Sequence, residues 1–154
     1  MVLDKFFVND ARTGNPAPRE AHGRFDGLLD RVLTGESVDL PALIARQVVA
    51  RPAYQAYAGE RMDTQIRFDN EASDTRTLIE IETEDRLGLL YALSQTFAGL
   101  QLDISGARIV TERGAAIDSF YVGELDGGKV VDPERQALIE SRLREAIHRL
   151  DAGA

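Results

Sequence analysis

The segment that decides the fold runs from Thr77 to Leu100 and reads TLIEIETEDRLGLLYALSQTFAGL. From Leu78 to Thr83 the side chains alternate between two faces, and one face carries Ile79, Ile81 and Thr83. A period of two is typical of a half-buried strand. Further along, apolar residues recur at three- and four-residue spacing, which predicts an amphipathic helix with Leu90, Leu93, Phe97 and Leu100 on one side. The segment therefore predicts a strand, a turn and a helix in succession.

The turn between this strand and this helix is the candidate binding site. Asp85 is a favoured residue for a helix N-cap, and Gly88 lets the backbone approach a group that a Cβ atom would exclude. The first N–H groups of a helix have no intrahelical partners, so this turn is predicted to bind a small anionic group such as a carboxylate. A capped turn with a packing glycine would use the same residues for structural reasons alone, and both interpretations stay open.

The residues Asp85-Arg86-Leu87-Gly88-Leu89-Leu90 resemble the D-R-x-G-L-L signature of ACT domains, which are small ferredoxin-like regulatory modules that commonly bind amino acids. The narrower resemblance is to the ACT repeats in the regulatory tail of the bifunctional PII uridylyltransferase and uridylyl-removing enzyme, the glutamine sensor of bacterial nitrogen control. Three further segments carry it: FDNEAS at 68–73, GARIVT at 106–111 and IDSFYV at 117–122. The family usually has proline where this chain has Leu87, so a less rigid turn is expected.

This resemblance implies a ligand site shared between two ACT units. In ligand-binding relatives the amino acid contacts the turn of one unit and the start of the following strand in its neighbour. The candidate ligand-binding residues are then Asp85, Arg86, Leu87, Gly88, Leu89, Leu90, Leu102, Asp103 and Ile104. Glutamine is the effector that the resemblance implies, and the implied partners are a second ACT domain, as a homodimer or otherwise, and the PII signal protein through the parent enzyme. The competing hypothesis is a protein interaction or dimerisation module without a small ligand.

Composition excludes several other functions. The 154 residues contain no cysteine, so the chain has no disulfide, thiol nucleophile or cysteine-ligated metal. The formal charge of −8 disfavours nucleic acid and anionic membranes as partners. No apolar run approaches the roughly 20 residues that span a bilayer, and the start MVLDKFF is unlike a secretory signal, so we expect a cytoplasmic protein.

No catalytic constellation is recognisable in the sequence, and no cofactor is expected. His22 and His148 lack the HExxH spacing of a zinc site. The nucleotidyltransferase signature and the His-Asp phosphohydrolase motif of the resembled enzyme are absent, so the chain is not expected to transfer uridylyl groups. Asp4 and Asp118 occupy equivalent positions of a repeat, and a pair of functional acids is the alternative to a purely structural role there.

That repeat relates the two ends of the chain. Residues 2–8 echo residues 116–122, and the same offset of 114 relates a helix with Phe25, Leu29, Val32 and Leu33 to one with Ile139, Leu143, Ala146 and Ile147. We therefore expect residues 1–61 to hold a truncated first ACT repeat, with a strand and a helix, plus a connecting helix. Residues 62–154 are expected to form the ACT domain, and the unpaired strand at 2–8 predicts self-association.

The predicted fold is α+β, with a four-stranded antiparallel sheet and two helices on one face. The expected strands are 64–69, about 76–83, 102–112 with a bulge near Ser105 and Gly106, and 115–125. Asp39 and Asp132 are predicted to cap helices, an earlier helix is expected to end at Leu33, and Arg51-Pro52 is expected to end the helix that Asp39 begins. Since only residues 151–154 are left after the last helix, the strand at 64–69 is expected to take the missing edge position, which gives the shifted order ββαββα.

Overall fold

The computed structural model describes residues 8–10, 13–46, 62–112 and 114–152. The chain divides into two compact units, Met1–Ala56 and Tyr57–Ala154, and each is considered by itself. The first contains the helices α1 (Arg19–Leu33) and α2 (Leu40–Arg46). The predicted strand at 2–8, apart from Val8, and the predicted helix end at Arg51-Pro52 lie outside the described residues.

In the first unit, the end of α1 and the start of α2 lie where the sequence predicts them. The α1 helix ends at Leu33, and the hydroxyl of Thr34 donates to the carbonyl of Asp30 at 2.8 Å. The carboxylate of Asp39 accepts a hydrogen bond from the N–H of Ala42 at 2.9 Å, which is the geometry of an N-cap. The predicted cap of α2 is confirmed.

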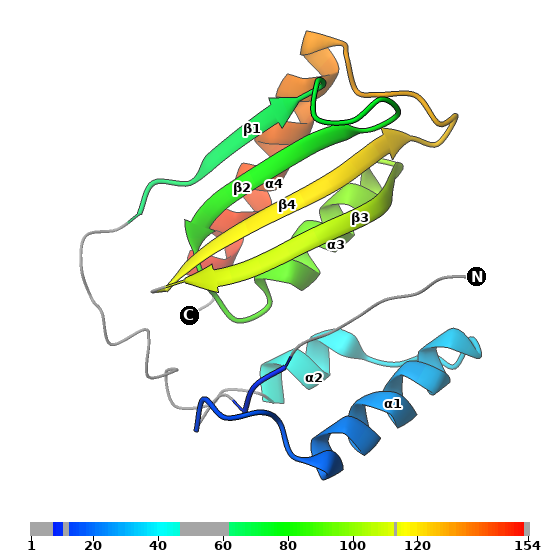
Figure 1. Cartoon of the computed structure of the whole chain (residues 1–154), viewed down its shortest axis with the longest axis vertical. Coiled ribbons are helices and arrows are strands. Elements are labelled where there is room, and N and C mark those ends of the chain that lie inside the picture. The colour runs from blue at the N-terminus through cyan, green and yellow to red at the C-terminus, as the bar shows by residue number, and fades with distance from the viewer. Residues whose placement is uncertain (1–7, 11–12, 47–61, 113, 153–154) are drawn as a thin grey trace. The chain divides into compact units, whose positions relative to one another are not determined.

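The second unit is a four-stranded antiparallel sheet with two helices on one face (Figure 1). Its elements follow the predicted order ββαββα: β1 (Gln65–Asp69), β2 (Thr77–Glu84), α3 (Leu89–Gly99), β3 (Leu102–Glu112), β4 (Ala115–Glu124) and α4 (Pro133–Ala152). The strands lie in the order β1-β2-β4-β3, so the predicted edge position of β1 is confirmed. The carboxylate of Asp132 accepts from the N–H of Glu134 at 3.1 Å and caps α4 as predicted.

The core lies between the sheet and the two helices. The predicted inner face of β2 is buried, since Ile79, Ile81 and Thr83 have almost no exposed surface. The other buried apolar residues of this core come from the remaining strands, the two helices and the loop before α4: Ile66, Leu89, Leu93, Phe97, Leu102, Ala116, Phe120, Val122, Val130, Ile139, Leu143 and Ile147. The opposite face of the sheet is open within the described unit, as Figure 1 shows.

A bulge in β3 separates two regions of the strand. Ile104 lies opposite Val122 and Gly106 lies opposite Tyr121, so Ser105 is the extra residue, as the change of parity in the sequence predicts. The hydroxyl of Ser105 donates to the carbonyl of Tyr121 at 3.2 Å. Beyond the bulge the pairing with β4 is regular up to Glu112.

A partly buried polar cluster connects the turn after β1 to the loop before α4. The Thr77 hydroxyl donates to the amide oxygen of Asn70 at 2.6 Å and accepts from the Val130 N–H at 2.8 Å. The Asn70 amide nitrogen donates to the Val130 carbonyl at 3.2 Å. These bonds tie β1 and its turn into the unit as structural parts.

Candidate functional site

The turn after β2 differs from its prediction in where the helix begins. Asp85 is not the N-cap of α3. Its N–H donates to the carbonyl of Gly114 at 2.8 Å, which prolongs the pairing of β2 with β4 by one step, and the helix begins only at Leu89 with Gly88 as its cap. The prediction that Asp85 caps the helix is therefore wrong, because strand pairing continues through this residue.

Gly88 is required by the backbone itself. Its φ angle of 82° lies in the left-handed region, which costs a residue with a Cβ atom roughly 1–2 kcal/mol. A glycine cap also has no side chain that could accept a hydrogen bond from the first turn of α3, and no such cap bond is present. The N–H of Leu89 donates to the carbonyl of Arg86 at 3.1 Å, so only the N–H groups that follow Leu89 in the first turn are candidates for binding an anion.

Arg86 holds the turn against the end of β2. One terminal nitrogen of its guanidinium donates to the Thr83 hydroxyl and to the Glu84 carbonyl, each at 3.1 Å. The other nitrogen bonds to the Glu84 carboxylate at 3.1 Å. The Thr83 hydroxyl in turn lies 2.8 Å from the hydroxyl of Thr64. The guanidinium therefore places a positive charge beside the turn while it fixes the turn's geometry.

The three leucines of the turn have different environments. Leu89 is 2% exposed and packs in the core, whereas Leu87 is 55% and Leu90 is 46% exposed. The buried Leu89 anchors the first turn of α3. The two exposed leucines, Leu87 and Leu90, lie on the surface immediately before and within the first turn of α3.

The other three candidate residues lie at the opposite end of the sheet. Leu102 pairs with Glu124, while the far end of β3, Glu112, pairs with Ala115 beside the turn. A strand of eleven residues spans roughly 30 Å, so one unit does not bring Leu102–Ile104 to its own turn. A site that uses both groups requires a second unit.

Within the start of β3 the three side chains have separate environments. Leu102 is buried in the core and Ile104 is exposed. Asp103 lies on the open face, where its carboxylate forms an ion pair with Arg76 at 2.9 Å. The guanidinium of Arg76 crosses β4 at Gly123, and a Cβ atom at that glycine would clash with it.

Asp118 is a buried acid whose environment the sequence analysis did not anticipate. It is 1% exposed on the core face of β4, between Ile81 of β2 and Ile109 of β3, and its Oδ1 atom has no hydrogen-bond partner. Burial raises the pKa of Asp118 to about 6; the backbone N–H of Val110 opposes this rise and the charge of Asp85 adds to it. The available signal was its parity, since Asp118 alternates with the core residues Ala116, Phe120 and Val122.

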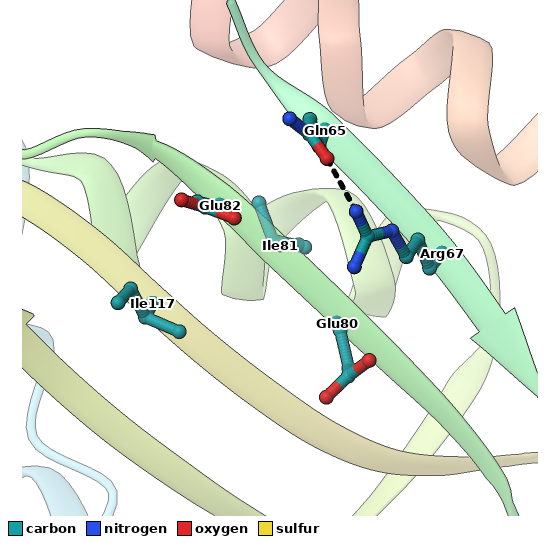
Figure 2. A pocket seen from close by; sticks show the side chains of 6 residues that line it. All are labelled: Gln65, Arg67, Glu80, Ile81, Glu82 and Ile117. Atoms are coloured by element: carbon teal, nitrogen blue, oxygen red, sulfur yellow. Dashed lines mark hydrogen bonds between the residues drawn. The ribbon is translucent and has the colours of Figure 1, made fainter. Parts of the chain in front are cut away.

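Two surface hollows lie away from the predicted site. The first, of about 100 Å³, is on the open face of the sheet and is lined by Gln65, Arg67, Glu80, Ile81, Glu82 and Ile117 (Figure 2). Within it, Arg67 donates to the side-chain oxygen of Gln65 at 2.6 Å. The second, of about 450 Å³, lies beside the start of β1 and is lined by Thr64, Arg144, Glu145, Ile147 and His148. Neither hollow contains a residue of the predicted site.

The described residues contain no cluster of three or more histidine, aspartate or glutamate side chains that could hold a metal ion. In the same part of the chain, no helix has the length and apolar character that crossing a membrane requires.

Comparison with known proteins identifies the family. Residues 65–150 match the family described as "ACR9-like, ACT-like domain". The chain belongs to the ACT-like domain family. This assignment confirms the family that the turn signature indicated, and the matched residues cover all four strands of the sheet.

The ACT-like chain is also similar to parts of longer proteins. It is 38% identical over 142 residues to the bifunctional uridylyltransferase/uridylyl-removing enzyme of Cereibacter sphaeroides. The aligned residues make up 92% of this chain and 15% of that protein. The proteins of the same name from Ruegeria pomeroyi and Azospirillum brasilense are 36% and 34% identical, over 95% and 96% of this chain and 16% of each of those proteins. The chain thus spans about a sixth of the length of these relatives. No solved structure matches it significantly.

Proposed function

We propose that this chain is a regulatory ACT module that senses a free amino acid, glutamine, and controls uridylyltransferase and uridylyl-removing activity toward the PII signal protein. The ACT-like family and the names of the similar proteins support the regulatory setting. The observation that carries the binding site is the start of α3, where Gly88 leaves the first turn without a side-chain cap. In this proposal the chain binds the amino acid and transmits that signal to the uridylyltransferase and uridylyl-removing activities, but it does not catalyse either reaction itself.

The turn offers complementary chemistry for an amino acid. The carboxylate of the ligand accepts hydrogen bonds from the N–H groups that follow Leu89 in the first turn of α3, where the helix dipole also favours negative charge. The guanidinium of Arg86 adds a positive charge at the edge of the turn. Exposed Leu87 and Leu90 provide an apolar surface for the methylene groups of the side chain.

A second ACT unit completes the site in this proposal. The start of β3 from a neighbouring unit, with Leu102, Asp103 and exposed Ile104, faces the turn and covers the other side of the ligand. The partner is a second copy of this chain or another ACT domain. Because the two halves of the site lie about 30 Å apart in one unit, binding is coupled to the association of two units.

A ligand-free interaction module is the second candidate function. It is favoured by the exposed apolar residues Leu87, Leu90, Ile104 and Ile109, which lie on the turn and on the edge strand β3. These residues would serve a protein contact whether or not an amino acid binds. The two functions differ in whether a free amino acid binds measurably to the chain.

The substitution Leu90→Glu tests the proposed carboxylate site. An acid in the first turn of α3 is favourable for the helix, but it repels a ligand carboxylate and competes for the same N–H groups. We expect glutamine to bind at least about tenfold more weakly, with an unchanged melting temperature because Leu90 is exposed. Calorimetric titration with a panel of amino acids, together with thermal melting, measures both.

Leu90→Gln is the matched control, since it removes the same apolar side chain without adding a charge. It is expected to bind glutamine more tightly than Leu90→Glu. Equal affinities of the two variants would show that charge at this position is irrelevant. A parent chain that binds no amino acid in the panel would leave the interaction module as the better account.

A further inference from the structure

The buried acid Asp118 lies one strand away from the edge of the sheet. It is the only charged side chain that is buried among the described residues, and its Oδ1 atom has no hydrogen-bond partner. Its strand, β4, pairs with the edge strand β3, where Ile109 lies opposite Asp118 (Figure 1). A single strand therefore separates an unsatisfied carboxyl group from the solvent at this edge.

The cover that β3 provides at this point is incomplete. Ile109 is 43% exposed although it lies on the helix-bearing face of the sheet, and its neighbours on that face, Ala107 and Thr111, are exposed as well. On the other side of β4 the residue opposite Asp118 is Ile81, which is 1% exposed. Solvent thus reaches the neighbours of Asp118 on the β3 side and not on the β2 side.

The strand β3 also supplies a polar contact to the buried acid. Burial raises the pKa of Asp118 to about 6, against the backbone N–H of Val110, which donates to the carboxyl group and favours its ionisation. When this part of β3 separates from β4, the bond is lost and water takes its place at both carboxylate oxygens. The acid then regains a pKa near its ordinary value of 3.8.

One charged group on the neighbouring strands acts on Asp118. The carboxylate of Asp85, in the turn after β2, repels a negative charge at Asp118 and so opposes its ionisation. The guanidinium of Arg86 bonds to the end of β2 instead. On β3 the charged residues Arg108 and Glu112 lie on the opposite face of the sheet. The ionised acid thus faces a like charge and is paired with no cation of the described strands.

The two helices add no compensating charge at this place. Their buried residues are all apolar: Leu89, Leu93, Phe97, Ile139, Leu143 and Ile147. Their half-buried titratable residues, within the described part of the chain, are Tyr91, Arg135 and Glu140. Arg135 and Glu140 are bound in ion pairs of their own. An ionised Asp118 is therefore stabilised mainly by contact with water, and the shortest way to water leads past β3.

We propose that Asp118 is a pH-sensitive switch for the edge strand: protonated, it keeps residues 107–112 of β3 paired with β4, and ionised, it releases this segment so that water reaches the carboxylate. The other strands and the two helices stay folded during this release. Because the hydrated acid ionises near pH 4 and the buried acid near pH 6, the fraction of molecules with an open segment rises between these values and then levels off. The switch needs no ligand and does not depend on the proposed function.

Amide hydrogen exchange of the full chain, followed by NMR between pH 4 and pH 7.5 and corrected for the intrinsic exchange rate, tests this switch. The equilibrium constant for opening is expected to rise by up to about a hundredfold at the hydrogen-bonded amides of residues 107–112, since each unit of pKa difference is a factor of ten. At the other edge, the opening constants of the β1 amides should stay constant, because β2 separates β1 from the strand of Asp118.

Two variants assign the effect to this carboxyl group. Asp118→Asn cannot ionise, so the opening constant of residues 107–112 is expected to be independent of pH in this variant. Glu112→Gln removes an exposed carboxylate from β3 itself and is the matched control, which should keep the pH response of the parent. Urea unfolding at each pH gives the constant for global unfolding, which should stay well below the opening constant of β3.

An opening constant of residues 107–112 that equals the global unfolding constant at every pH would overturn the proposal, because release of the edge would then require unfolding of the whole unit. So would an equal rise at β1 and β3, or a pH response that persists in Asp118→Asn. If Asp118→Asn does not fold, the comparison of β3 with β1 in the parent and in Glu112→Gln still decides.

Discussion

A chain that begins at Thr75 is expected to lose its cooperative fold, whereas a chain that begins at Met62 is expected to keep it. The shorter chain lacks β1, and with it the buried Ile66, the partly buried Phe68 and the Asn70 amide that bonds to Thr77 and Val130. Removing a large buried apolar side chain costs about 2–5 kcal/mol, and a typical domain is stable by only about 5–15 kcal/mol. The loss of the whole strand approaches the stability of the unit.

Urea unfolding of the two truncated chains, followed by circular dichroism, checks this expectation. The chain from Met62 should show a single sigmoidal transition, and the chain from Thr75 should show none or one at far lower urea. Similar urea midpoints for both chains would mean that β1 contributes little to the free energy of unfolding. The expectation that β1 is an integral strand of the unit would then be wrong.

Asp118→Asn is expected to stabilise the chain by up to about 3 kcal/mol at pH 7.5. The buried carboxyl has a pKa of about 6, against an ordinary value of 3.8, and each unit of difference corresponds to about 1.4 kcal/mol. Near pH 7.5 the parent must bury an ionised carboxylate whose Oδ1 atom has no hydrogen-bond partner. The amide is neutral and nearly the same size.

The pH dependence of stability gives the sign of this effect. Below about pH 4 the Asp118 carboxyl is protonated in both the folded and the unfolded chain, so no ionised carboxylate has to be buried and the free energy of unfolding is highest. Between about pH 4 and 6 the unfolded chain releases the proton while the folded chain retains it, so the free energy of unfolding falls as pH rises. Above about pH 6 the folded chain also ionises and the loss levels off.

Urea unfolding of the parent and of Asp118→Asn between pH 4 and pH 7.5 measures both parts of this prediction. The variant should lack the parent's fall in stability across that range. Glu80→Gln, which removes an exposed carboxylate from the open face of the same sheet, serves as the control and should leave the slope unchanged. A variant Asp118→Asn that is less stable than the parent at pH 7.5 would show that the carboxylate is paired in solution.

Much of the fold could be predicted because local patterns and overall topology agree. The alternation in β2 and the caps at Asp39 and Asp132 each use local rules of backbone geometry, and all are present in the structure. The predicted apolar face of α3 was wrong at its start, where Leu89 is buried and Leu90 is exposed. The edge position of β1 followed from counting the strands that the family fold requires. The change of parity in β3 was sufficient to locate the bulge.

The site was less predictable because hydrogen bonds between strands that are distant in the sequence override the local preferences of the residues in the turn. Asp85 has the sequence character of a cap, but its N–H bonds to Gly114, a residue distant in the sequence, and the helix start moves to Gly88. The burial of Asp118 and the path of Arg76 over Gly123 also depend on contacts between separate strands. Contacts between separate strands produce no local sequence pattern from which they could be predicted in a single sequence.

The shared site is tested most directly by mixing two variants that each damage a different half of it. Leu90→Glu places an acid in the turn, and Ile104→Glu places one at the start of β3. In a mixed dimer one site carries both acids and the other is intact. We predict that each variant alone binds glutamine at least about tenfold more weakly than the parent in a calorimetric titration, and that an equimolar mixture recovers the parent's affinity at about one quarter of the sites. A mixture without any site of the parent's affinity although the parent chain binds glutamine, or an Ile104→Glu variant that binds as tightly as the parent, would contradict a site built from two units.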